Sequence, residues 1–222
     1  MIIRTATLAF VIAFTGAVAP GPMLALVIGQ VLAGGLMPVF FILLGHALIE
    51  ALFLLCIRAG LSGFLARKKT RGALALLGGA ALGWMGWQLV ADAGTAELAG
   101  SVAQALPWYT LVAAGIGVSL SNPYFTGWWA TVGTGQVATL GLKARREFAA
   151  FFFGHEMGDV VWYVFVALLL VIGRQWLTDT MYQALIWVCG VVLLALAVLF
   201  LFLGGKHLAT ANTAESPGEH SP

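Results

Sequence analysis

The chain has 222 residues, of which 61% are hydrophobic and only 9% are Asp, Glu, Lys or Arg, and its formal net charge is +2. Soluble domains carry about 25% charged residues, so this composition excludes a large soluble domain. Several apolar stretches reach the roughly 20 residues that a helix needs to cross a bilayer. The composition therefore predicts an all-α polytopic membrane protein.

Six membrane-spanning helices are predicted, at about 6–33, 36–57, 72–90, 107–133, 148–172 and 181–203. Together they form one transporter domain over residues 1–205. The polar segment 206–222, which ends in ESPGEHSP, is expected to be a disordered cytoplasmic tail because it cannot bury enough apolar surface to fold.

The basic residues predict the orientation of these helices. If the N-terminus is cytoplasmic, all of the 11 Lys and Arg residues except Arg174 fall on the cytoplasmic side. Lys and Arg are enriched in the cytoplasmic loops of membrane proteins. Both termini are therefore expected in the cytoplasm, with the chain crossing a prokaryotic plasma membrane several times.

The two halves of the chain share three elements in the same order. A helix-breaking stretch comes first, APGPM at 19–23 and SNPYF at 121–125. GQVLAGGL at 29–36 and GQVATLGL at 135–142 follow, and then GHALIE at 45–50 and GHEMGD at 154–159. Each half, about 1–95 and about 105–205, holds three helices, so the second must enter the membrane from the opposite side. The pattern indicates an inverted-topology repeat, which is common among secondary transporters.

Each GH element places a histidine and an acid in an apolar helix. His46 and Glu50 are four residues apart, as are His155 and Asp159, so each pair lies on one helix face. If the two helices are antiparallel, each histidine should face the acid of the other helix. Buried carboxylates at mid-membrane usually face a cavity, so we expect a proton-coupling or substrate-binding site, with static interhelical pairs as the alternative. Glu156 is a weaker candidate, because it lies about 100° around the helix from His155.

Two of the predicted helices are interrupted near their middle. Pro20, Gly21 and Pro22 break the first, and Asn122 and Pro123 break the fourth. Proline removes a backbone N–H, and broken backbone is tolerated in a membrane only where it lines a cavity or is buried in protein. The half-helices that begin after the breaks would present N–H groups to such a cavity, which suits a substrate carboxylate. A simple proline kink is the alternative at either break taken alone.

These motifs resemble the lysine exporter family, the LysE/RhtB-type amino-acid exporters, over nearly the whole chain before the tail. The resemblance rests on APGPM, which contains the family's PGP signature, on the element that ends at Glu50, and on Asn122-Pro123. It implies a six-helix secondary carrier, not an enzyme, that needs no cofactor and expels amino acids in exchange for protons. This sequence departs from the family at Ile49, where glycine is usual, at Glu50, where aspartate is usual, and in its two additional histidines.

The leading hypothesis is thus an amino-acid exporter in which the substrate ammonium meets Glu50 or Asp159. The alternative is a divalent metal-ion exporter that uses the His/carboxylate cluster, although no resident metal is expected. A thiol–electron relay would need paired cysteines, and Cys56 and Cys189 lie in separate segments. Expected partners are membrane lipid, the small-molecule substrate and protons. A homodimer stays open, and no nucleic-acid-binding pattern or nucleotide-binding loop occurs in the sequence.

Overall fold

A computed structural model of the chain describes residues 1–18, 21–60, 64, 67–96 and 106–213. All regular structure in these ranges is helical. The α-helices are α1 (Ile2–Ala17), α2 (Pro22–Gly34), α3 (Met37–Arg58), α5 (Lys68–Asp92), α6 (Trp108–Ser121), α7 (Pro123–Trp128), α8 (Thr134–Leu140), α9 (Arg145–Gly173) and α10 (Asp179–Thr213). A π-helical segment, Trp129–Gly133, joins α7 to α8, and the 3-10 helices Ala93–Thr95 and Arg174–Trp176 follow α5 and α9.

The prediction of an all-helical membrane protein is confirmed. Among the described helices, four are long and apolar enough to cross a membrane singly: α3, α5, α9 and α10. The first and fourth predicted spans are instead divided where the sequence predicted breaks, between α1 and α2 and between α6 and α7. Pro20 lies outside the described residues, whereas Pro22 and Pro123 are the first residues of α2 and α7. The six-span inverted arrangement and its orientation stay predictions.

The end of the chain differs from the expectation for a tail. The last helix continues to Thr213, so the first residues of the expected disordered segment are helical, and residues 214–222 lie outside the described part. The reason is a packing surface that the sequence pattern did not reveal. Leu208 of α10 packs against Gly72 near the start of α5, which supports the additional helical turns.

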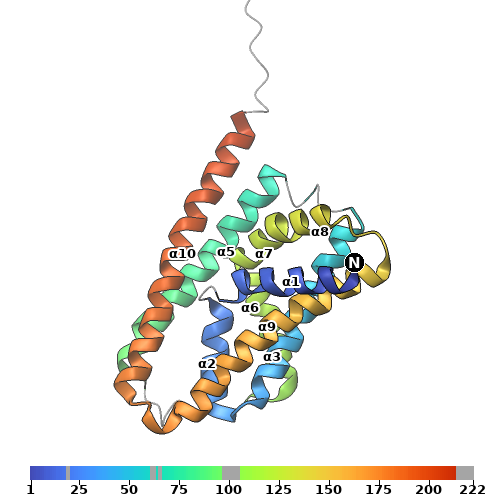
Figure 1. Cartoon of the computed structure of the whole chain (residues 1–222). Helices are drawn as coiled ribbons and strands as arrows, with labels where there is room; N and C mark the ends of the chain where they lie inside the picture. The colour runs from blue at the N-terminus through green and yellow to red at the C-terminus, as the bar shows by residue number, and fades with distance from the viewer. Residues whose placement is uncertain (19–20, 61–63, 65–66, 97–105, 214–222) are drawn as a thin grey trace, which may run out of the picture.

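Helices α5 and α10 run side by side along one side of the molecule (Figure 1). Glycines make this close approach possible. A Cβ atom on Gly86 would press on the backbone of Gly190 in α10, and one on Gly190 would press on the backbone of Gly86. The glycine-rich sequence of α5 is therefore explained by small-residue packing between helices.

The glycines of the two GH elements make equivalent contacts. Helix α3 packs on α6, and α9 packs on α1. Gly45 touches the α6 backbone at Val112, and Gly154 touches the α1 backbone at Ala6, so that no side chain fits at either position. Each GH helix thus lies against the first helix of the other half of the chain, and this contact fixes the height of the histidine that follows the glycine.

The glutamines of the two GQV elements repeat this exchange between the halves. Gln30 in α2 accepts a hydrogen bond through Oε1 from the backbone N–H of Leu106, just before α6, at 3.2 Å. Gln136 in α8 donates through Nε2 to the carbonyl oxygen of Leu8 in α1 at 3.3 Å. The shared sequence elements therefore join the two halves of the chain.

Candidate functional site

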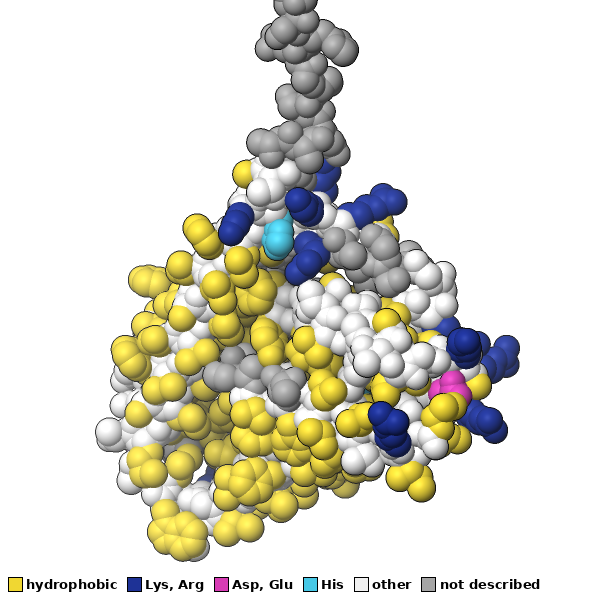
Figure 2. Space-filling view, turned by 45° about the horizontal axis from the view of Figure 1, so that its top comes forward, with side chains coloured by type: hydrophobic (Ala, Val, Ile, Leu, Met, Phe, Trp, Pro, Cys, Tyr) yellow, Lys and Arg dark blue, Asp and Glu magenta, His cyan; other side chains and the backbone are white. Residues whose placement is uncertain are grey.

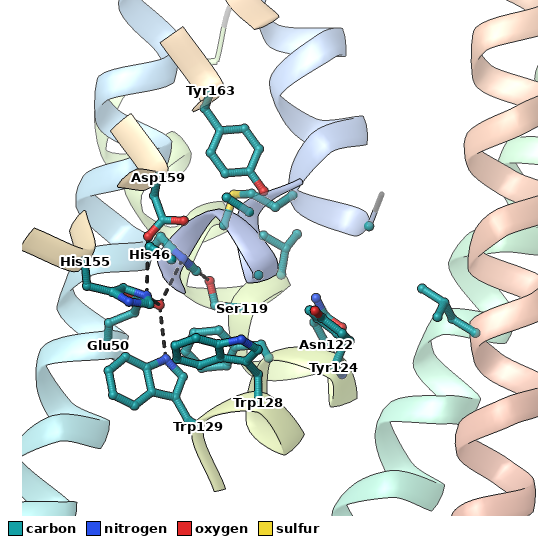
Figure 3. A pocket seen from close by; sticks show the side chains of 18 residues that line it. His46, Glu50, Ser119, Asn122, Tyr124, Trp128, Trp129, His155, Asp159 and Tyr163 are labelled. Carbon is teal, nitrogen blue, oxygen red and sulfur yellow. Dashed lines mark hydrogen bonds and ion pairs between the residues drawn. The ribbon is translucent and has the colours of Figure 1, made fainter. Parts of the chain in front are cut away.

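A cavity of about 60 Å³ lies where helices of both halves meet, large enough for several water molecules. Figure 3 shows polar side chains from α3, α6 and α9 directed toward one another there, with the start of α7 beside them. The polar and ionisable side chains that line it are His46, Glu50, Ser119, Asn122, Tyr124, Trp128, Trp129, His155, Asp159 and Tyr163. The four acids and histidines predicted from the GH elements are thus brought together.

Glu50 is the centre of this polar cluster, and only 2% of it is exposed. Its Oε1 atom lies 3.1 Å from Nε1 of Trp129, 3.2 Å from Nε2 of His155 and 3.3 Å from Nε2 of His46. The indole N–H can only donate, so Glu50 accepts that bond. The other oxygen, Oε2, is buried and has no hydrogen-bond partner among the described residues. These three contacts of the carboxyl group are therefore all made by Oε1.

The contacts of His46 require a proton between it and Glu50. The Ser119 hydroxyl donates to the carbonyl oxygen of Gly115 at 2.6 Å, which leaves its oxygen to accept from Nδ1 of His46 at 2.8 Å. In a neutral imidazole with its hydrogen on Nδ1, the unprotonated Nε2 would face the carboxylate, and two hydrogen-bond acceptors would then be in contact. A favourable contact at 3.3 Å therefore needs one further proton, on His46 Nε2 or on Glu50 Oε1. At this contact His46 and Glu50 therefore share one proton.

The α9 side of the cluster keeps unpaired polar atoms. His155 Nε2 contacts Asp159 Oδ2 at 3.5 Å in addition to Glu50. Nδ1 of His155 and Oδ2 of Asp159 are buried, and neither has a hydrogen-bond partner among the described residues. Leaving such an atom unpaired costs about 1–3 kcal/mol. A bound substrate, ion or water in the cavity would remove part of that cost.

The antiparallel pairing expected from the sequence is correct for one pair and wrong for the other. His155 meets Glu50 as expected. His46 does not pair with Asp159, because its two ring nitrogens are engaged by Ser119 and Glu50. Glu156, the weaker candidate, is not among the residues that line the cavity. Its carboxyl group is close enough to interact with that of Glu50, and its Oε1 is buried without a hydrogen-bond partner in the described part of the chain.

The two helix breaks differ in what they offer the cavity. Gly21 and Asn122 line it, whereas Pro22 and Pro123 occupy first helical positions, where the missing N–H is no loss. Asn122 Oδ1 accepts a hydrogen bond from the backbone N–H of Tyr124 at 3.0 Å, so the start of α7 is already capped. Gly21 has no side chain with which to cap α2. The start of α2 is therefore the better position for an anionic group.

Several polar cavity residues, among them Tyr163 and Ser119, were not identified from the sequence, and for Trp129 the sequence favoured core packing. Tyr163 is four residues beyond Asp159 and therefore on the same face of α9, a signal that helical spacing contains. Ser119 is a polar residue within an apolar helix, which is a weaker signal. Nothing in the sequence distinguishes an indole that only packs from one that also donates to a carboxylate, as Trp129 does.

Three of the cluster's residues could also hold a divalent cation. His46, Glu50 and Asp159 each offer one ligand atom within 4.8 Å of the other two. One imidazole nitrogen with two carboxylate oxygens suits first-row transition metals. The metal alternative therefore has a geometric basis in the structure.

Comparison with known proteins places these features in a family context. Residues 14–204 match the family model described as LysE type translocator. The chemotactic transduction protein ChpE of Pseudomonas aeruginosa is 30% identical over 203 residues, which is 88% of this chain and 96% of that protein. No solved structure was found to match. The matched range contains both helix breaks and all of the polar cluster.

Proposed function

Because this chain belongs to the LysE type translocators and is a multi-pass protein of the cell membrane, we propose that it exports amino acids or similar small zwitterions in exchange for protons. Family membership accounts for a membrane exporter. The substrate class and the coupling to protons rest on the chemistry of the cavity.

The contacts of His46 with Ser119 and Glu50, from which a shared proton is inferred, support proton coupling. A carrier needs a group that releases its proton when substrate arrives and takes one up when substrate leaves. An ammonium group has three N–H donors and no acceptor. Glu50 Oε2, which has no hydrogen-bond partner among the described residues, and Asp159 Oδ2, which His155 Nε2 contacts at 3.5 Å, suit those donors. An ammonium bound there would add positive charge beside His46 and favour release of the shared proton.

The carboxylate of a zwitterionic substrate would lie at the start of α2. Gly21 and Met23 of that region line the same cavity as Glu50. Backbone N–H groups and the positive end of a helix favour an anion. We place the substrate between these two ends, with its ammonium toward α3 and α9.

The exchanged contacts of Gly45 with α6 and Gly154 with α1 support an inverted repeat around this cavity. In such transporters the two halves move against each other about a central site, which opens to one side of the membrane at a time. We propose this alternating access here.

The test is counter-flow in proteoliposomes with a panel of amino acids at two pH values. Glu50→Gln keeps the size of the side chain but cannot carry the proton, so it should lower pH-driven transport at least tenfold while expression stays normal. Asp92→Asn, which neutralises an exposed acid at the end of α5, is the matched control and should transport normally. Normal pH-driven transport by the Glu50 variant would disprove the proton coupling.

Export of a divalent metal is the second candidate, and the spacing of ligand atoms in His46, Glu50 and Asp159 favours it. Zinc, cobalt and nickel belong in the same proteoliposome panel. Metal transport without amino-acid transport would select this alternative. Cells that express the protein would then tolerate added metal and gain no tolerance to amino acids.

A further inference from the structure

A second hollow lies outside the central cavity, in a groove between α5, α7 and α10. Apolar side chains make up most of its wall, among them Leu74, Phe200 and Leu203. Helix α7 separates the two spaces, because Thr126 lines the groove while Phe125 lines the cavity. The proposed transport function does not use this groove.

Basic side chains gather at one end of the groove. Arg71 from the start of α5 and His207 from the end of α10 line it. Arg71, Lys206 and Lys68 are all close enough to His207 to interact with it electrostatically. Figure 2 shows Lys and Arg side chains grouped with a His side chain at the top of the molecule, above a surface rich in hydrophobic side chains. None of the described residues that line the groove is Asp or Glu.

A bound anion would reduce the repulsion among Lys68, Arg71 and Lys206. Like charges held close together repel, and here they come from two helices that are fixed in place by close packing. Both helices are long enough to cross the membrane, and the bases lie at the same end of the pair, where lipid headgroups are expected. The groove therefore joins basic side chains at the helix ends to an apolar wall that lies farther along the two helices.

We propose that this groove binds an anionic phospholipid, with the phosphate against Arg71 and the α10 bases and an acyl chain along the apolar wall. A guanidinium group matches a phosphate with two parallel hydrogen bonds, which distinguishes Arg71 from the surrounding lysines. A free inorganic anion would use the charges but leave the apolar wall uncovered. The charge pattern and the apolar wall together select a lipid.

Native mass spectrometry of the full-length purified protein tests this proposal, with phosphatidylglycerol and phosphatidylcholine supplied in equal amounts. We expect selective retention of phosphatidylglycerol. Arg71→Gln should reduce this retention about fivefold, the factor that corresponds to about 1 kcal/mol for one base near an anionic surface. Arg145→Gln, which removes an exposed arginine at the start of α9, is the matched control and should retain the lipid as the wild type does.

A second variant tests the apolar wall without changing charge. Ala75 also lines the groove, and Ala75→Phe would fill it, so retention of phosphatidylglycerol should fall although every base remains. Equal retention of the two lipids by the wild type would overturn the proposal. Equal loss in the Arg71 and Arg145 variants would also overturn it, as would displacement of the lipid by millimolar inorganic phosphate, which would identify a site for free anions.

Discussion

Replacing Trp129 with phenylalanine tests whether the cluster around Glu50 depends on an indole N–H. The indole is 1% exposed, and its Nε1 lies 3.1 Å from Glu50 Oε1. A hydrogen bond to a charged acceptor contributes about 1.5–3 kcal/mol to the free energy of unfolding. For a chain of this length, that loss corresponds to a fall of about 3–12 °C in the unfolding temperature. The smaller ring also leaves a cavity, which adds to the loss.

Two comparisons separate the hydrogen bond from the cavity. Trp162→Phe makes the same substitution at an indole whose buried Nε1 has no hydrogen-bond partner among the described residues, so no hydrogen bond is lost. In a Glu50→Gln background, Trp129→Phe should cost about 1 kcal/mol less than in the wild type, because a neutral acceptor forms a weaker bond. Thermal unfolding in detergent, followed by the loss of helical circular dichroism, measures all of these variants. An identical cost of Trp129→Phe in both backgrounds would refute the reasoning.

Two further substitutions test the positioning of the same cluster. Gly45→Ala forces a methyl group against the α6 backbone and should destabilise the protein by about 1–3 kcal/mol, whereas Gly29→Ala, where a Cβ atom meets nothing within 4 Å, should be neutral or stabilising in the same thermal assay. Ser119→Ala leaves Nδ1 of His46 buried without its acceptor, so it should cost about 1–3 kcal/mol and weaken pH-driven transport. Ser119→Thr keeps the hydroxyl group and should have the stability and the pH-driven transport of the wild type. Equal transport rates in Ser119→Ala and Ser119→Thr would show that this hydrogen bond does not position His46.

Local features of the site were predictable because their causes lie within a few residues of chain. The spacing of His46 and Glu50 places them on one helix face wherever that helix packs, and the structure joins them at 3.3 Å. The break before Pro123 follows from the missing N–H of proline and from the Asn122 side chain, which caps the new helix. The π-helical segment Trp129–Gly133 had no such signal, although it follows the same break directly.

The sequence by itself determined that this protein is helical, lies in a membrane, and carries paired acids and histidines beside interrupted helices. Composition and short-range spacing are sufficient for those conclusions. Only the tertiary structure decided which side chains are hydrogen-bonded to each other. Trp129 donates to Glu50, 79 positions away in the chain, and Ser119 is hydrogen-bonded to Nδ1 of His46, 73 positions away. Such bonds depend on how each helix is rotated and shifted along its axis. An error of one turn displaces a side chain by about 5.4 Å, more than the length of any hydrogen bond.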